Sequence, residues 1–280
     1  MKTISKVFSC ILAFSSLLGS VEGQNRYKIW YDKPASYWEE ALPIGNGRIA
    51  AMVFGDPQLE QIQLNEETVS AGSPYQNYNE EAKAALPEMR RLIFEGKYEE
   101  AQNMAATKIL SQVGNEMPYQ TVGRLNIRYQ DHKKVSNYYR DLDISNAMTV
   151  TRYKVDGVEF TEETFASFTD QLVIRHIKSS KPGAINCELF FNTPMRDPKR
   201  SIYGKKGLRL EGITHGSRYF PGKVHYCADL DVKNKGGEVT MANDTLLSVQ
   251  GASELTLYIS MATNFVNYKE ISGDPYQRNK

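Results

Sequence analysis

Hydrophobic and polar positions alternate along most of the second half of the chain. The clearest run lies between residues 255 and 261, where leucine, isoleucine and methionine at every second position alternate with threonine, tyrosine and serine. This period of two is typical of a strand with one buried face. Similar runs predict strands over 149–155, 158–166, 172–178, 184–191, 207–214 and 223–232.

Turn-forming residues separate these runs at intervals of roughly ten residues. Asp156-Gly157, between two β-rich runs, is the strongest hairpin signal, and Lys181-Pro182-Gly183 and Lys235-Gly236-Gly237 mark further turns. Short strands at this spacing, without helices between them, predict a mainly β fold, a large antiparallel β-sandwich of the supersandwich type.

One helical segment interrupts the β pattern near residues 79–110, and it predicts a helical hairpin insertion. Apolar residues recur there at helical spacing, which favours packing against the core. Pro87 fits the first turn of a helix that begins near Leu86, and Gly96 would end that helix. A second helix is expected after Lys97.

Both ends of the chain differ from the middle. Residues 1–23 combine a positive start, a short apolar run and small residues, as in a signal peptide, so we expect export to the periplasm or the extracellular space. A short membrane anchor is the alternative. Residues 264–280 lose the period-two pattern and contain Gly273-Asp274-Pro275, which is typical of the start of a linker. The domain itself would span 24–263.

Composition excludes several classes of protein. The net charge is +1, with 34 basic and 33 acidic residues, so neither nucleic acid nor, after removal of the signal, a membrane is an expected partner. The four histidines lack metal-ligand spacing, and we expect no metal and no cofactor. Cys187 and Cys227 could form a disulfide or lie buried as free thiols; the sequence leaves both open.

The polar residues at 45–48 and 65–68 are the candidate site. Gly45-Asn46-Gly47-Arg48 lacks the features of a phosphate-binding loop and fits a tight turn before a strand at 49–54. Arg48 could pair with a carboxylate of either a substrate or the protein. Glu66 and Glu67 would point to opposite faces of a continuing strand, so they do not form a catalytic pair. The candidates for a substrate rim or an interdomain contact are Asn46, Arg48, Asn65, Glu66 and Thr68, and no catalytic residue is assigned.

Ordered motifs across the mature chain carry a resemblance to a known family. They include Glu39 to Arg48, Leu64-Asn65-Glu66-Glu67-Thr68, Arg90 to Ala101, Tyr139-Arg140-Asp141-Leu142-Asp143 and Asp170-Gln171. Together these resemble the N-terminal region of glycoside hydrolase family 95, the α-L-fucosidases. The resemblance implies an N-terminal β-sandwich followed by an (α/α)6 barrel that carries the catalytic residues of an inverting reaction. Nothing in residues 1–280 matches that barrel.

The resemblance therefore implies a part of a secreted exo-glycosidase that acts on terminal α-1,2-linked L-fucosyl groups, with this part inactive alone. Its implied partners are a fucosylated oligosaccharide, bound by the whole enzyme, and the missing C-terminal barrel. Two alternatives remain open. One is a free-standing carbohydrate-binding β-sandwich module, and the other is a fragment of an α-L-galactosidase.

Overall fold

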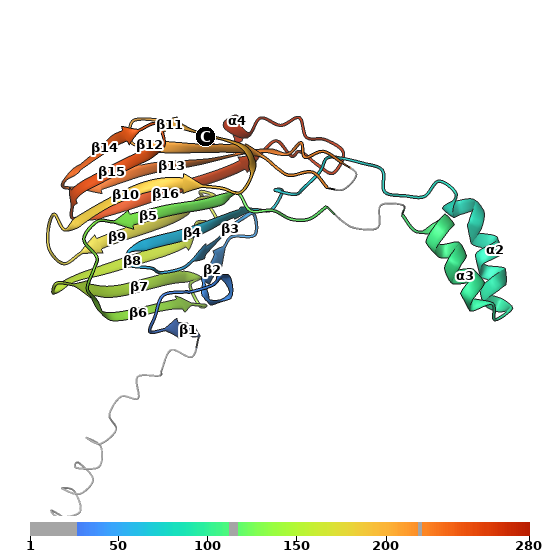
Figure 1. Ribbon diagram of the computed structural model, residues 1–280, viewed down its shortest axis with the longest axis horizontal. Helices are drawn as coiled ribbons and strands as arrows, with labels where there is room; N and C mark the ends of the chain where they lie inside the picture. The colour runs from blue at the N-terminus through green and yellow to red at the C-terminus, as the bar shows by residue number, and fades with distance from the viewer. Residues whose placement is uncertain (1–26, 112–116, 218–219) are drawn as a thin grey trace, which may run out of the picture.

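Two stacked antiparallel sheets form the body of the molecule (Figure 1). The computed structural model describes residues 27–111, 117–217 and 220–280. Within these residues the strands form one nine-stranded and one seven-stranded sheet. In spatial order the nine-stranded sheet contains β1 (Lys28–Tyr31), β6 (Val135–Asp143), β7 (Met148–Val155), β8 (Val158–Ala166), β9 (Val173–Ser179), β16 (Glu254–Thr263), β13 (His225–Lys235), β12 (Gly207–Ile213) and β11 (Arg196–Tyr203). The seven-stranded sheet contains β14 (Glu238–Asn243), β15 (Leu246–Ala252), β10 (Ile185–Asn192), β5 (Gly123–Tyr129), β4 (Leu59–Glu66), β3 (Ile49–Val53) and β2 (Leu42–Gly45).

The hydrophobic core lies between the two sheets. The predicted mainly β fold, an antiparallel β-sandwich, is confirmed. Every second residue of β16 faces inward, and Leu255, Leu257 and Ile259 are fully buried. In the other sheet, β10 contributes Leu189 and Phe191 in the same alternating way. Burial of each such side chain stabilises the fold by about 1.5–3 kcal/mol before the loss of chain entropy is counted.

The predicted hairpin at Asp156-Gly157 is present between β7 and β8. Val155 pairs with Val158, and the two turn residues have φ values of +47° and +81°. Positive φ at both central positions matches the twist of the flanking strands, and glycine adopts it without strain.

Two helices form the predicted hairpin, α2 (Ala82–Phe94) and α3 (Tyr98–Met104), followed by a π-helical turn, η2 (Ala105–Ile109). Gly96, with φ +74°, ends α2 as expected. The expected start near Leu86 is wrong, because α2 begins four residues earlier and Pro87 lies inside it. Pro87 removes one hydrogen bond to the preceding turn, and the alanine-rich start of α2 favours a helix there despite that loss.

The helical hairpin stands away from both sheets (Figure 1). Ala85 and Leu92 of α2 and Ala101 of α3 are buried, but Leu86, Ile93 and Phe94 are 40%, 41% and 88% exposed. The prediction that this apolar stripe packs into the core is therefore wrong. Its spacing defines an apolar face of a helix, but that face is not part of the core between the sheets.

The segment after β16 is folded onto the nine-stranded sheet. It contains the short helix α4 (Pro275–Arg278), capped by the side chain of Asp274. Asn279 donates a hydrogen bond to Asp229 of β13 at 2.8 Å. The expected linker is thus part of the packed body within residues 264–280, and whether it leads to a further domain stays a prediction.

Three further observations complete the description. A 3-10 turn, η1 (Trp38–Glu40), precedes β2. The predicted signal peptide, residues 1–23, lies outside the described residues. None of the helices in the described part is long and apolar enough to cross a membrane.

Candidate functional site

The turn between β2 and β3 begins the candidate site at one end of the sandwich. Gly47 has φ +95°, which provides the tight turn that the sequence predicted. The side-chain oxygen of Asn46 accepts hydrogen bonds from the backbone N–H groups of Arg48 and Ile49, at 3.1 and 2.9 Å. Its amide nitrogen donates to the carbonyl of Ser167 at 2.8 Å. Asn46 is buried and holds the turn against the nine-stranded sheet, so its contacts are structural.

Arg48 extends from this turn across the end of the core. Its Nε donates to the side-chain oxygen of Gln171 at 2.7 Å, and one terminal nitrogen donates to the carbonyl of Met261 at 2.8 Å. The same nitrogen lies 3.5 Å from a carboxylate oxygen of Glu66. The guanidinium therefore joins the two sheets, and the carboxylate that it contacts belongs to the protein.

Glu66, the last residue of β4, is held from both sides. One oxygen faces Arg48, and the other accepts hydrogen bonds from the backbone N–H and the hydroxyl of Thr68, at 2.8 and 2.6 Å. Its side chain is 5% exposed. Burial raises the pKa of this carboxyl above its ordinary value, while the Thr68 hydrogen bonds and Arg48 act in the opposite direction. Both oxygens are thus engaged.

These residues line a cleft of about 440 Å³. Glu67, Gln171, Thr263, Phe265 and Arg278 complete much of its wall. The cleft adjoins an apolar hollow of about 300 Å³, and the two share Thr68 and Phe265. The second hollow is lined largely by apolar side chains, among them Tyr75, Met117, Val224, Tyr268 and Ile271.

The structure brings three of the predicted site residues together and separates another. Arg48, Glu66 and Thr68 meet in the cleft, and Asn46 supports it from the adjacent turn. Asn65 pairs with Ala50 and does not line the cleft, because neighbouring strand residues point to opposite faces.

Sequence reasoning missed two residues that complete the cleft. Gln171 has φ +57°, which is uncommon for a residue other than glycine, and its side chain bridges Arg48 and the carbonyl of Phe168. Asp170-Gln171 was a motif of the resemblance, which is the signal that could have marked it. Arg278 lies in the segment that looked like a linker, and it donates to the carbonyl of Thr263 at 3.3 Å.

The cleft supplies binding groups but no arrangement for acid–base hydrolysis. A glycosidase of the usual kind needs two carboxyl groups that face each other across the substrate. Here Glu66 is held by Arg48 and Thr68, while Glu67 is exposed and follows it directly along the chain. In the described part of the chain, no group of three or more His, Cys, Asp and Glu side chains could hold a metal ion.

The disulfide considered between Cys187 and Cys227 is not formed. Both residues are buried free thiols. Cys187 faces the core from β10, whereas Cys227 lies in β13 of the other sheet, where its Sγ contacts the carbonyl of Pro275 at 3.3 Å. The two side chains therefore belong to different layers of the molecule.

The two large antiparallel sheets, packed face to face with a polar cleft at one end, define a β-sandwich domain. The chain belongs to the family described as Glycosyl hydrolase family 65, N-terminal domain, whose model matches residues 29–268. This match covers both sheets from within β1 to beyond β16.

Curated relatives of the chain are fucosidases. "Alpha-L-fucosidase 2" of Arabidopsis thaliana is 31% identical over 261 residues, which cover 85% of this chain and 30% of the relative. Proteins named "Probable alpha-fucosidase A" from Aspergillus oryzae and Aspergillus niger are 22% and 26% identical, over 93% and 54% of this chain and 36% and 20% of their own lengths. The chain thus spans about a third or less of these relatives. The resemblance to the N-terminal domain of an α-L-fucosidase-like glycoside hydrolase is confirmed.

Proposed function

We propose that this chain is the non-catalytic N-terminal domain of an exported, inverting exo-glycosidase that hydrolyses terminal α-1,2-linked L-fucosyl groups of glycans. The family match over residues 29–268, together with the fucosidase relatives, carries the proposal. The contacts of the cleft support the non-catalytic role, because its one buried carboxylate is held by Arg48 and Thr68.

In this proposal the cleft end of the sandwich faces the rest of the enzyme. The guanidinium groups of Arg48 and Arg278 and the carboxylate of Glu67 form a polar surface, and the adjoining hollow around Tyr268 is apolar. A polar rim beside an apolar centre is the usual composition of a contact between domains. Arg48, Glu66 and Thr68 would keep this end rigid so that it presents one shape to the catalytic domain.

The inactivity of the chain alone is directly testable. The purified chain is incubated with fucosyl-lactose, and free fucose is measured against a blank without protein. We expect no release above the blank, because Glu66 and Glu67, the two acidic residues that line the cleft, do not face each other across a substrate. Sustained release that scales with the concentration of the chain would contradict the proposal.

The parent enzyme requires a second experiment. Reading the coding DNA beyond Lys280 should show a frame that continues for several hundred residues, and the longer protein should release fucose from fucosyl-lactose. An α-L-galactosidase is the alternative for the same fold, so the assay includes the matching α-L-galactoside. Faster turnover of the galactoside would show that the parent enzyme is an α-L-galactosidase. The assignment of this chain as its N-terminal domain would not change.

Export is tested on the expressed protein. We expect cleavage after residue 23, so N-terminal sequencing of the protein from the periplasm or the medium should begin at Gln24. Retention of Met1 in a membrane fraction would favour the anchor instead.

A further inference from the structure

Three polar side chains form one row across neighbouring strands of the seven-stranded sheet. Gln63 of β4 pairs in register with Arg124 of β5, and Arg124 pairs with Asn192 of β10. Because directly paired residues of antiparallel strands point to the same face, the three side chains lie together. Their neighbours Leu64, Leu125 and Phe191 are buried in the core, so the row lies on the outer face of the sheet.

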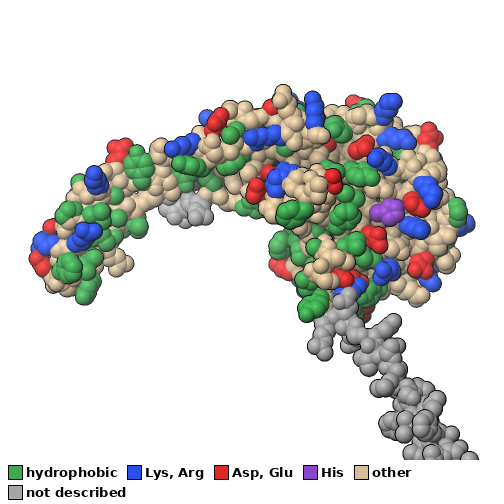
Figure 2. Space-filling model, turned by 180° about the vertical axis from the view of Figure 1, so that it is seen from behind, with side chains coloured by type: hydrophobic (Ala, Val, Ile, Leu, Met, Phe, Trp, Pro, Cys, Tyr) green, Lys and Arg blue, Asp and Glu red, His purple; other side chains and the backbone are tan. Residues whose placement is uncertain are grey.

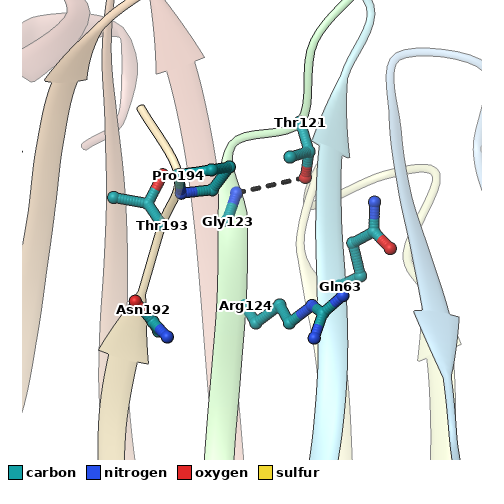
Figure 3. Close-up of a pocket in the computed structure, with 7 residues that line it drawn as sticks. All are labelled: Gln63, Thr121, Gly123, Arg124, Asn192, Thr193 and Pro194. Atoms are coloured by element: carbon teal, nitrogen blue, oxygen red, sulfur yellow. Dashed lines mark hydrogen bonds between the residues drawn. The ribbon is translucent and has the colours of Figure 1, made fainter. Parts of the chain in front are cut away.

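A hollow of about 290 Å³ opens beside this row (Figure 3). Gly123 lies where β5 begins, and a Cβ there would stand 2.5 Å from the carbonyl oxygen of Asn192, so β5 and the end of β10 approach each other closely at this point. Pro194 follows the end of β10 and has no N–H to continue the ladder, so the sheet stops and the hollow stays open. Its volume is near the lower limit of about 300 Å³ for small-molecule pockets.

The hollow combines fixed walls with unused hydrogen-bonding groups. The Thr121 hydroxyl donates to the carbonyl of Leu64, and the Thr193 hydroxyl donates to the carbonyl of Val122, each at 2.8 Å. By contrast, the side-chain amides of Gln63 and Asn192 make no hydrogen bond to any other described residue. Each amide offers two donor hydrogens and one acceptor oxygen.

The next row extends the same chemistry along the face of the sheet. Gln61, Asn126 and Phe190 are paired across β4, β5 and β10. Gln61 accepts a hydrogen bond from Arg124 at 2.8 Å, which orients the guanidinium within the row. Phe190 is half-buried beneath the guanidinium of Arg128, 4.8 Å from the ring centroid. An aromatic ring thus lies near the amide-lined hollow.

Arg124 is the one charged side chain among the residues that line the hollow, and the other lining groups are neutral. The nearby Arg128 is paired with Glu188 at 3.0 Å. Two amides with free hydrogen-bonding groups and one guanidinium suit a ligand with several neutral hydroxyl groups, each both donor and acceptor. We propose that the hollow at Gln63, Arg124 and Asn192 is a binding site for one neutral sugar residue of a glycan.

This site is separate from the cleft at Arg48 and Glu66, since none of the residues lining the hollow lines the cleft. It would hold a glycan on the sandwich while another part of the enzyme acts on it. The site does not depend on the specificity of the catalytic domain, and binding by this chain can be measured where the chain hydrolyses nothing.

Amide chemical-shift titration of the whole chain tests the site with three probes: fucosyl-lactose, lactose and galacturonate. We expect a neutral sugar to shift the signals of β4, β5 and β10 around the row, with weak, saturable binding. The double variant Gln63→Ala and Asn192→Ala should weaken that binding about tenfold or more, because two sets of neutral hydrogen bonds are lost. The matched control Gln250→Ala changes an exposed amide of β15 in the same sheet and should bind as the wild type does.

The outcomes separate this site from the proposed function. Absence of shifts with both neutral sugars, or equal binding by the double variant, overturns the site. Binding of galacturonate alone also overturns it, because the hollow would then be an anion site at Arg124. Spectra of the variants that match the wild type away from the row show that the fold is retained. Fucose release by the longer protein is a separate measurement and can succeed or fail independently.

Discussion

Two glutamates and one arginine lie together in the core, between the sheets. Arg175 of β9 donates through one nitrogen to Glu60 of β4, at 3.0 Å, and to Glu162 of β8. Tyr129 and Tyr153 donate to the other oxygen of Glu162, at 2.5 and 2.7 Å. All three charged side chains are at most 1% exposed. One guanidinium thus serves two buried carboxyl groups, and such an imbalance favours retention of a proton.

Glu60 is one of these two carboxyl groups, and its pKa is raised. Burial raises its pKa to about 7, and Glu162 adds to that rise while Arg175 opposes it. Between an unfolded pKa of about 4.5 and the folded value, the folded state binds more protons than the unfolded state. The free energy of unfolding therefore falls as pH rises through this window, by an amount on the order of 3 kcal/mol.

Glu60→Gln should remove this part of the pH dependence. Glutamine keeps an acceptor for the backbone N–H groups of Phe54 and Gly55 but does not titrate. We expect urea unfolding at pH 5, 6, 7 and 8 to give a flatter profile for the variant than for the wild type. Glu238→Gln, at an exposed position of β14, is the matched control and should follow the wild type. Parallel profiles for Glu60→Gln and wild type would show that another group holds the proton.

At the scale of elements, the C-terminal segment acts as a cover for one strand. Cys227 of β13 is buried beneath it, with its Sγ at 3.3 Å from the carbonyl of Pro275. Asn279 holds the end of the segment to Asp229, which also forms a two-bond pair with Arg209, at 2.6 and 2.7 Å. Burial raises the pKa of the Cys227 thiol to about 12, so the thiol is protonated and unreactive at neutral pH.

Removal of residues 274–280 should therefore make Cys227 reactive. In a Cys10→Ser background, we expect a thiol reagent to modify one cysteine of the folded, truncated protein quickly and none in the full-length protein. Cys187 should stay protected in both, because it lies in the core. Adding Cys227→Ser to the truncated protein should abolish the fast reaction. An unreactive thiol after truncation would mean that other residues, not this segment, cover β13.

The strands that were predicted from the sequence share one physical property. In β16, apolar residues reach the core at alternate positions. In β8, which has the same bounds as the predicted run, alternate positions also reach the core, but they include Glu162 and Thr164. Two other strands lack that pattern. In β6 both Arg140 and Asp141 are buried, and the edge strand β11 is charged and largely exposed and contains Pro198. Their place in the sheet depends on pairing: β6 pairs with β1 and β7, and β11 pairs with β12. A local hydrophobic period in the sequence does not reveal such pairing.

The candidate site shows the same division between local and distant information. The turn at Asn46 and Gly47 and the position of Glu66 at the end of β4 follow from local sequence. The link from Arg48 to Gln171 and Met261 crosses 123 and 213 residues of chain, so only the folded sheets bring these groups together. The row at Gln63, Arg124 and Asn192 likewise depends on strand register.

At the scale of the whole molecule, the sandwich and the helical hairpin differ in what holds them together. The sheets share one large core, whereas the hairpin buries few side chains and exposes Phe94 and other apolar residues, which gather on its surface (Figure 2). Its ion pairs, such as Arg91 with Glu88 and Glu95, are exposed and contribute little. Isolated helices of this length are marginal in water, so the hairpin should open locally while the sandwich stays folded.

Replacement of residues 79–110 by a short Gly-Ser linker tests this independence. The ends can be joined, because the side chains of Asn77 and Ser111 are hydrogen-bonded to each other. Since the core is untouched, we expect the free energy of unfolding to change by no more than about 0.5 kcal/mol. Binding of a dye that reports exposed apolar surface should fall, and Phe94→Ser should reduce it partly with no loss of stability. A large loss of stability on replacement would contradict the prediction. It would mean that the hairpin stabilises the sandwich through contacts at the point where residues 79 and 110 join it.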